Sequence, residues 1–382
     1  MGSAALHALL ARGVDAIGFD PNSPGAAEGS SHGSCRVYRR FNFESVAYTA
    51  LGSRAWDLWR ALEAEQPLPI IKPVPVLEAG PRGSSLVHDS RRAALGDGRH
   101  APLLTGAQVN ARFPAFDLPG DWEAVIQDTG GVLLIRNALE ALQAPAMAQD
   151  RIVRDRAGFR RSDHGIVVTA GGAEVLARSV IVTTGPWMGE LLPDLAPYLE
   201  VTRQAVAWFR PADPATTGYP QFPIFILDGP EGPVYGFPDF EQRGVKAAWH
   251  GHGAKASPAD WTLDPDPSGP DEIQLGRVAR TLRTFVPGAY GETVDREFCL
   301  YTSTPASDRA PADPDQDKAE EFIVDRLSSD PRIVVGSACS GHGAKFASAI
   351  GELLAALACD RAQITPTPFR IDRFAAFADP GG

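Results

Sequence analysis

Residues 1–20 read MGSAALHALLARGVDAIGFD, and this stretch decides the fold. After Gly2, apolar residues recur at helical spacing, and DAIGFD has the composition of a short strand that ends at Asp20. A helix followed by such a strand is the second half of a βαβ unit that binds a dinucleotide. Gly2 takes the place of the third glycine of G-x-G-x-x-G, and Asp20 that of the acid that binds the ribose. The alternative is a surface helix followed by a turn aspartate.

The composition indicates a soluble protein that acts on small molecules. The chain has 382 residues, enough for two domains, and 47 acidic against 36 basic residues give a net charge of -11. This charge argues against nucleic acid or an anionic membrane as the main partner. No apolar run approaches the ~18 residues of a membrane span, which predicts a cytoplasmic location. The four scattered cysteines predict neither a disulfide framework nor a metal site.

Strand-like runs alternate with helical patterns along the chain, which predicts an α/β fold. A helix is expected within 45–65, a hairpin leading to a buried strand at 180–184, and a strand, glycine-rich turn and helix over 332–358. The last of these helices is expected to begin near Lys345. Residues 203–301 have the strands and prolines of a mixed sheet, and loops are expected at 213–220, 264–269 and 311–317.

Two polar segments carry the chemistry. In GSSHGSCRVYRR (29–40), small residues let the backbone approach a flat or anionic ligand while cations point into the site, although a solvated basic face is the alternative. The residues of this set are His32, Arg36, Arg39 and Arg40. In CSGHGAKFASAIGELL (339–354), the expected helix N-terminus suits a group that becomes anionic. Its N–H donors and cations come from Gly341, His342, Gly343 and Lys345. A glycine-rich connector with a surface lysine is the alternative there.

Six segments in order resemble the monomeric sarcosine oxidase and N-methyltryptophan oxidase family, FAD-dependent amine oxidoreductases of the D-amino-acid oxidase-like superfamily. They are AALHALLARGVDAIGFD, SSHGSCRVYR, VYGFPDF, VKAAWHGHG, FCLYT and CSGHGAKFASAIGELL. The likeness covers nearly the whole chain. It implies a Rossmann-like FAD-binding domain with an inserted mixed-sheet substrate domain. The expected ranges are 1–60, 125–190 and 305–382 for the first domain, and 61–124 and 191–304 for the second.

The resemblance also implies roles for individual residues. Cys299 matches the cysteine that carries the flavin as a thioether, Arg39 and Lys345 match the pair that holds the substrate carboxylate, and Lys246 matches the lysine that activates oxygen. The remaining family positions are pocket residues at His250, Tyr235 and Tyr301, and flavin-flanking residues at His32 and Arg36. The implied partners are a small amino acid and oxygen, and the implied state is a monomer.

The chain departs from the family pattern at several positions. Ser31 stands where a second histidine is common, Cys35 replaces a small hydroxyl residue, and Cys339 and Ala344 stand where bulky aromatics are common. The smaller residues predict room for a substrate larger than sarcosine. The first strand and the first two glycines of the dinucleotide motif are missing. We therefore expect the working protein to be longer by roughly 15–20 residues and to bind FAD more tightly than this chain, while a vector-derived start on a fragment is a second explanation.

Three functions are compatible with these residues. The first is oxidation of the C–N bond of an amino acid, N-methyl or cyclic, to an imine, with oxygen reduced to hydrogen peroxide. The second is a flavin dehydrogenase of the same fold that uses another electron acceptor. The third is a flavin-free relative without catalysis, against which the retained set of cations counts.

Overall fold

The computed structural model describes residues 1–43, 47–251, 253–260, 262, 269–304, 321–337 and 339–377. The loop expected at 311–317 and nearly all of that at 264–269 lie outside these residues, as does His252 of the VKAAWHGHG segment. The loop expected at 213–220 contains a short helix, α7 (Pro214–Thr217). Asp213 caps this helix by accepting a hydrogen bond from the Ala215 N–H, and Pro214 starts it.

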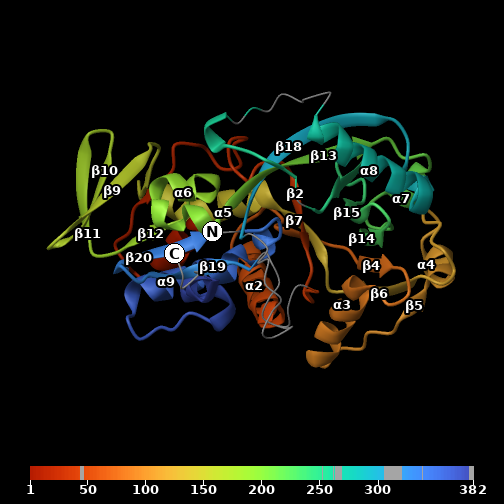
Figure 1. Cartoon of the computed structure of the whole chain (residues 1–382), viewed down its shortest axis with the longest axis horizontal. Helices are drawn as coiled ribbons and strands as arrows, with labels where there is room; N and C mark the ends of the chain where they lie inside the picture. The colour runs from red at the N-terminus through yellow and green to blue at the C-terminus, as the bar shows by residue number, and fades with distance from the viewer. Residues whose placement is uncertain are drawn as a thin grey trace.

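Helices from the first and the last part of the described chain pack together in one part of the molecule (Figure 1). Helix α1 (Gly2–Ala11) confirms the predicted N-terminal helix, and it lies against α9 (Ala347–Cys359) and α5 (Ile135–Met147). Small residues permit this packing, because a Cβ on Gly351 would lie 2.4 Å from that of Ala4. The predicted helix within 45–65 is α2 (Ala47–Ala64).

The strands beside these helices form two separate small sheets. Strand β1 (Gly18–Phe19) pairs in parallel with β8 (Ile152–Val153), while β12 (Val180–Val182) and β19 (Ile323–Leu327) flank β20 (Asp330–Ser337). Among the described strands, none joins β1 to β12. The expected buried strand at 180–184 is therefore shorter, and only Val182 within it is fully buried, because β12 is at a sheet edge.

A nine-stranded mixed sheet forms the other part of the molecule and confirms the mixed sheet expected within 203–301. Its order is β17-β13-β16-β15-β14-β4-β6-β5, with β18 also pairing with β13. The strands are β4 (Val76–Gly80), β5 (Leu104–Thr105), β6 (Glu123–Gln127), β13 (Glu200–Phe209), β14 (Ile224–Gly229), β15 (Gly232–Phe237), β16 (Val245–Trp249), β17 (Ala254–Lys255) and β18 (Thr293–Ser303). This sheet and the parallel strands at the chain ends confirm the α/β class.

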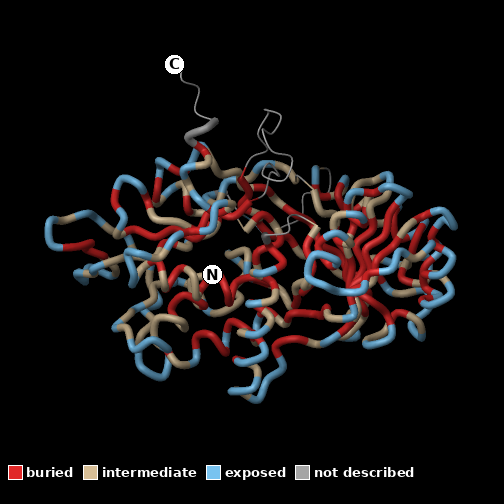
Figure 2. The backbone as a smooth tube through the Cα atoms, turned by 90° about the horizontal axis from the view of Figure 1, so that it is seen from below, coloured by how far each residue is buried: buried red, intermediate tan, exposed pale blue. Residues whose placement is uncertain are grey.

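The two faces of the large sheet differ because side chains alternate along each strand. One face packs against α8 (Pro270–Phe285) in an apolar core that includes Leu77, Phe225 and Leu282. Runs of buried residues accordingly follow the strands in the interior of this part of the molecule (Figure 2). The opposite face carries one row of residues in register across six strands: Glu78, Ile226, Tyr235, Ala248, Val206 and Glu297.

The remaining elements connect and cover these sheets. One small sheet has the order β2-β7-β3, and another, β11-β10-β9, projects from the molecule (Figure 1). The bounds are β2 (Cys35–Tyr38), β3 (Ile71–Pro73), β7 (Gly131–Leu134), β9 (Ala157–Ser162), β10 (Gly165–Ala170), β11 (Ala173–Ala177), α3 (Ser85–Gly96), α4 (Gly106–Arg112) and α6 (Met188–Leu191). No helix within the described residues is long and apolar enough to cross a membrane.

Candidate active site

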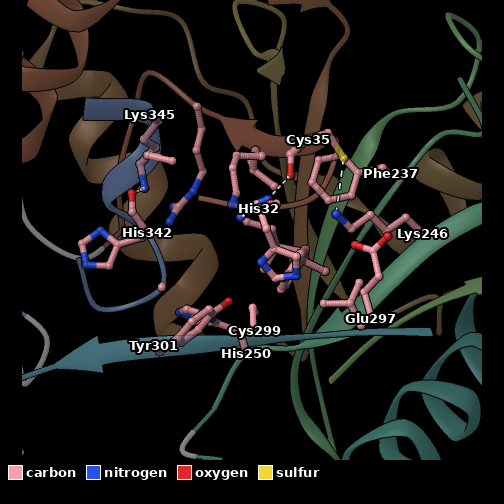
Figure 3. A pocket seen from close by; sticks show the side chains of 18 of the residues that line it. His32, Cys35, Phe237, Lys246, His250, Glu297, Cys299, Tyr301, His342 and Lys345 are labelled. Carbon is pink, nitrogen blue, oxygen red and sulfur yellow. Dashed lines mark hydrogen bonds between the residues drawn. The ribbon is translucent and has the colours of Figure 1, made fainter. Parts of the chain in front are cut away.

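A cavity lies against the face of the large sheet that carries this row, and residues within 32–43 and 341–345 close it (Figure 3). It holds about 840 Å³ of empty space, including its opening to solvent. Most of the residues predicted from the sequence line it: His32, Arg36, Arg39, Lys246, His250, Cys299, Tyr301, Gly341, His342 and Lys345. The fold therefore brings together side chains that are up to 313 positions apart, from His32 to Lys345.

Arg40 does not line the cavity; its Nε donates to Ser53 Oγ at 3.1 Å and lies 3.7 Å from Asp97 Oδ2.

Gly2, Asp20 and Gly343 are not among the lining residues either. Gly2 begins α1, and a Cβ there would lie 2.5 Å from Thr183 Oγ1, so glycine permits a close approach between α1 and the end of β12. Asp20 follows β1, is exposed, and accepts a hydrogen bond from the Asn22 N–H at 2.9 Å. Their binding of a cofactor stays a prediction.

The Arg36 guanidinium is hydrogen-bonded to the backbone around it. It donates hydrogen bonds to the carbonyls of Cys35, Ser30 and His32 at 2.7, 2.9 and 2.7 Å. These bonds fix the loop that leads into β2. Arg36 lines the cavity while its Nη1 and Nη2 are directed at carbonyl groups of its own loop, and its binding of a cofactor stays a prediction.

Lys246 places a buried ammonium group on the cavity wall. It is 5% exposed, and its Nζ donates to Cys35 Sγ at 3.6 Å. The rings of Trp208 and Phe237 lie 5.2 and 5.4 Å from the same nitrogen. A cation in such surroundings stabilises negative charge more strongly than it would in water.

Cys299 lies on β18 among aromatic and basic groups. Burial raises the pKa of its thiol, and the charges of Arg36 and Lys246 act in the opposite direction. Burial also raises the pKa of Tyr235 to about 12 and that of Tyr301 well above its usual value. The hydroxyls of these tyrosines are hydrogen-bonded to each other, and both remain protonated at neutral pH.

His32 and His250 complete the polar lining of this wall. Burial and the charge of Arg36 lower the pKa of His32, so its ring is neutral at pH 7. The ring of His250 lies 6.3 Å from that of Tyr235 and 6.2 Å from that of Tyr301, between centroids.

The glycine-rich turn differs from its prediction. The N–H groups of His342 and Gly343 both donate to the Cys339 carbonyl at 2.9 Å, so Gly343 offers no N–H donor to a ligand. The 3-10 turn η5 (Gly343–Phe346) contains Lys345 and continues directly into α9, which begins at Ala347, so the helix expected to begin near Lys345 is confirmed. In the tight turn at 339–343, these two N–H groups therefore point at the Cys339 carbonyl and not at the cavity.

Gly341 and Lys345 nevertheless occupy the cavity wall. Gly341 has φ +71°, and a Cβ there would lie 2.2 Å from Tyr301 Cε2. Lys345 is buried, and its Nζ donates to the His342 carbonyl at 3.1 Å. Ala344 lines the cavity beside it, whereas Cys339 packs against Gly343.

Sequence reasoning missed an acidic partner of Arg39. Glu78 Oε1 accepts from Arg39 Nη1 at 3.3 Å, and both side chains are buried. The signal was a glutamate in VLEAG (76–80), a strand otherwise made of apolar residues and glycine. The same reasoning missed Glu297, which lines the cavity and accepts from Arg243 at 2.8 Å. Among the described residues, no group of three or more His, Cys, Asp or Glu could hold a metal ion.

The profile of the FAD dependent oxidoreductase family matches residues 1–357. The chain belongs to this family. Members of the family similar to this chain include monomeric sarcosine oxidase of Arthrobacter sp. (strain TE1826), 30% identical over 94% of this chain and 90% of that protein. N-methyl-L-tryptophan oxidase of Yersinia pestis (strain Pestoides F) is 30% identical over 98% of this chain and 95% of that protein.

Solved structures show the same fold at lower identity. NikD, an amino acid oxidase essential for nikkomycin biosynthesis, superposes with a TM-score of 0.76 at 20% identity and covers 97% of this chain and 93% of its own. L-proline dehydrogenase from P. horikoshii superposes with a TM-score of 0.75 at 18% identity, covering 97% and 95%. The chain is thus an FAD-dependent oxidoreductase with the fold of these flavoenzymes.

The cavity residues fit a flavin. The Cys299 thiol lines the cavity, and Lys246 and Lys345 supply positive charge for a ring system that becomes anionic on reduction. Buried cations stabilise such a charge more strongly than cations in water would.

Proposed function

We propose that this flavoenzyme oxidises the C–N bond of a secondary amino acid, N-methyl or cyclic, to an imine, with oxygen reduced to hydrogen peroxide. The observation that carries the proposal is the convergence of Arg39, Lys345 and Lys246 with Cys299 on one cavity. The chain is similar to sarcosine oxidase and N-methyl-L-tryptophan oxidase, whose names give N-methyl amino acids as their substrates.

Arg39 and Lys345 are the proposed ligands of the substrate carboxylate. Guanidinium and ammonium groups form short, charge-assisted hydrogen bonds with carboxylates, and burial strengthens them. Holding the carboxylate fixes the orientation of the neighbouring C–N bond. It also selects amino acids over amines that have no carboxylate.

Tyr235, Tyr301 and His250 form the proposed wall of the substrate pocket. Their rings exclude water, and the raised pKa values of the two tyrosines keep their hydroxyls as neutral hydrogen-bond donors. Bound FAD would supply the acceptor for two electrons. Lys246 would place its positive charge where oxygen becomes negative as it is reduced.

The proposed attachment point of FAD is Cys299, through a thioether, and the proposed substrate is larger than sarcosine. Ala344 supports the second point, because it lines the cavity where the family often has a bulky aromatic residue. The cytoplasmic location, the monomeric state and the domain boundaries stay predictions from the sequence.

The first experiment is purification of the protein, precipitation with acid and a visible spectrum of the pellet. A yellow pellet that becomes colourless for Cys299→Ala is the expected result for a thioether. Cys359→Ala is the matched control, because Cys359 is an exposed free cysteine at the end of α9, outside the cavity, and should leave the pellet yellow.

The second experiment tests turnover with N-methyl and cyclic amino acids, with hydrogen peroxide as the readout. The decarboxylated amine of each substrate should react at least a hundredfold more slowly, as expected for the loss of a buried charge-assisted contact of roughly 3 kcal/mol. If the substrate is oxidised only when an artificial electron acceptor is added, and no peroxide forms, the protein is instead a flavin dehydrogenase.

A further inference from the structure

Cys35 is a buried thiol at the start of strand β2, and the proposed function gives it no role. Only 1% of the residue is exposed, and it belongs to an apolar cluster that includes Val76 and Phe237. It also lines the cavity (Figure 3), where its Sγ accepts a hydrogen bond from Lys246 Nζ at 3.6 Å. The thiol is therefore in contact with the cation proposed to act on oxygen.

Lys246 has more N–H donors than its surroundings accept. An ammonium group has three donors, and sulfur is a weak acceptor. In the part of the chain that the structure describes, Cys35 Sγ is the only atom that accepts a hydrogen bond from Lys246. The rings of Trp208 and Phe237 near the same nitrogen offer only their π faces. Donors therefore remain for a small polar molecule that lies against both the ammonium group and the sulfur.

Hydrogen peroxide is a molecule of this kind, and it reacts with thiolate sulfur. The ammonium group of Lys246 would stabilise negative charge on the sulfur during this reaction. The sulfur attacks one peroxide oxygen, so that an S–O bond forms while the O–O bond breaks. The second oxygen leaves as hydroxide and takes up a proton to become water. Sulfur loses the two electrons that the peroxide gains, and the product is a sulfenic acid.

We propose that Cys35 is a modification site at which hydrogen peroxide oxidises the thiol to a sulfenic acid beside Lys246. The inference rests on the proposed function for its source of peroxide, because oxygen would be reduced next to Lys246 and within reach of the sulfur. Cys35 replaces a small hydroxyl residue of the family pattern, and a hydroxyl group does not form a sulfenic acid. The site therefore belongs to this chain and not to the family pattern.

The modification would slow the reaction of the reduced enzyme with oxygen. The oxygen atom added to Cys35 accepts hydrogen bonds more strongly than the sulfur does, so it would hold the ammonium group of Lys246. That group is the one proposed to stabilise charge on oxygen. Peroxide would then limit the activity that produces it, and a thiol reductant, which converts a sulfenic acid back to a thiol, would restore the rate.

The first test is the order in which the cysteines are oxidised. The purified holoenzyme is exposed to increasing amounts of hydrogen peroxide, and catalase then removes the excess. Unfolding in urea with dimedone labels every sulfenic acid, and mass spectrometry of the peptides locates the label. We expect label at Cys35 before Cys359, although Cys359 is exposed and Cys35 is buried. Label at Cys359 first, or none at Cys35, would overturn the inference.

Two controls assign the preference to the fold and to Lys246. Peroxide added after unfolding should oxidise Cys35 and Cys359 together, and a preference that survives unfolding would count against the inference. Lys246→Met keeps a similar volume and should slow the oxidation of Cys35 roughly tenfold, because the charge beside the sulfur is lost. The matched control is Lys72→Met, since Lys72 also lies near two aromatic rings but outside the cavity lining. Equal oxidation rates in the Lys246 and Lys72 variants would contradict the role of the ion beside Cys35.

Reoxidation of the reduced flavin by oxygen measures the consequence. Each protein is compared with itself before and after exposure to peroxide. We expect the rate constant to fall roughly threefold or more in the unmodified protein, to recover with dithiothreitol, and to stay constant for Cys35→Ser. No change in the unmodified protein, or an equal fall for Cys35→Ser, would overturn the effect on Lys246.

Turnover separates this inference from the proposed function. If turnover of substrate forms peroxide and Cys35 becomes labelled, both are supported. If peroxide forms while Cys35 stays a thiol, only the inference is overturned. If turnover forms no peroxide, the oxidase proposal is wrong, and the titration with added peroxide by itself decides whether Cys35 is a modification site.

Discussion

At the residue scale, the geometry of the cavity depends on single positions that tolerate few residue types. Gly341 combines a left-handed backbone with direct contact to the Tyr301 ring, so both its φ angle and its missing Cβ matter. Glu78 is a second case, since Arg39 and Gln127 donate hydrogen bonds to its buried carboxylate. Both features place the side chains that face a ligand.

Gly341→Ala should destabilise the fold by roughly 2–4 kcal/mol, because backbone strain adds to the displacement of Tyr301. Gly13→Ala is the matched control. Gly13 has φ +69°, and a Cβ added there would meet no atom within 4 Å, so its cost should be about 1 kcal/mol of strain alone. Chemical unfolding of both variants measures the difference, and equal losses would contradict the role of the Tyr301 contact.

At the element scale, small residues decide how closely α1 and α9 approach each other. Alanine normally stabilises a helix interior relative to glycine, because glycine loses more conformational freedom on folding. Gly351 is an exception, since an added Cβ would lie 2.4 Å from Ala4 Cβ and 2.5 Å from its carbonyl carbon. Close contact between the helices therefore outweighs intrinsic helix propensity at this position.

Gly351→Ala should lower the free energy of unfolding by roughly 1–2 kcal/mol, since overpacking exceeds the gain in propensity. Gly96→Ala, in α3, is the control: a Cβ added there would meet no atom within 4 Å, and the change should be neutral or slightly stabilising. Thermal unfolding followed by circular dichroism tests the pair. Stabilisation by Gly351→Ala would show that α1 and α9 are less closely packed.

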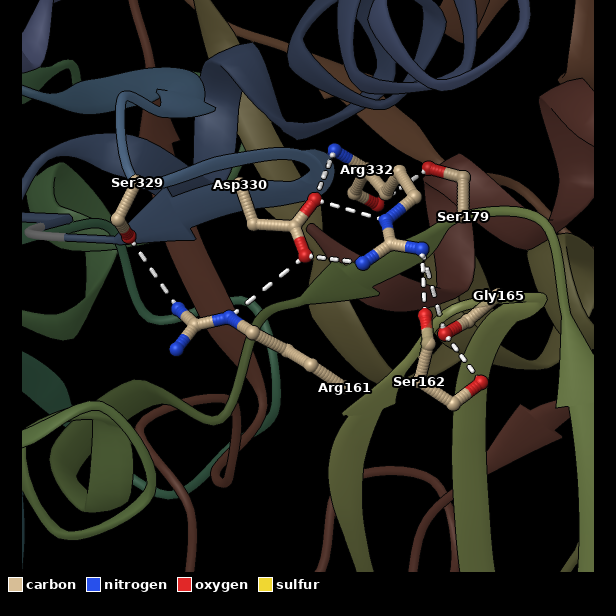
Figure 4. A network of polar contacts seen from close by, with 7 residues as sticks. All are labelled: Arg161, Ser162, Gly165, Ser179, Ser329, Asp330 and Arg332. Atoms are coloured by element: carbon tan, nitrogen blue, oxygen red, sulfur yellow. Dashed lines mark hydrogen bonds and ion pairs between the residues drawn. The ribbon is translucent and has the colours of Figure 1, made fainter.

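At the scale of the whole molecule, a polar network connects the projecting β9–β10 hairpin to β20 (Figure 4). Arg332 Nη2 lies 2.7 Å from Asp330 Oδ2, while Arg332 Nη1 donates to the Ser162 carbonyl at 2.9 Å. Arg161 of the hairpin lies 3.6 Å from the same carboxylate oxygen. The hydrogen bonds from Arg332 lower the pKa of Asp330 to about 2.

Asp330→Asn should destabilise the protein at pH 7 by roughly 1–3 kcal/mol, the usual contribution of charge-assisted hydrogen bonds. Because the folded pKa of Asp330 lies below its ordinary value of 3.8, its contribution is full above pH 4 and is lost as the pH falls towards 2. Urea unfolding at several pH values between 5 and 3 should show the two proteins converging. A constant difference over this range would contradict the assignment to the Asp330 charge.

The sequence predicted the elements whose signals are local. The periodicity of 1–20, the helix within 45–65 and the strand that leads into the glycine-rich turn are each determined within a few residues, and the structure confirms them. The prediction of a free N–H donor at Gly343 was wrong, because the Cys339 carbonyl accepts hydrogen bonds from the N–H groups of both His342 and Gly343. A hydrogen bond of that kind depends on a tight three-dimensional turn that residue spacing does not reveal.

The sequence by itself determined the family, the α/β class and which basic residues belong to the candidate site, because motifs and periodic patterns are properties of contiguous residues. Only the tertiary structure decided that Arg36 is bound by its own loop and that Arg39 is paired with Glu78. Residues 39 and 78 meet because β4 lies beside β14 in the large sheet and its register turns Glu78 to the cavity face. Such a pairing arises from sheet order, which joins residues far apart in the chain.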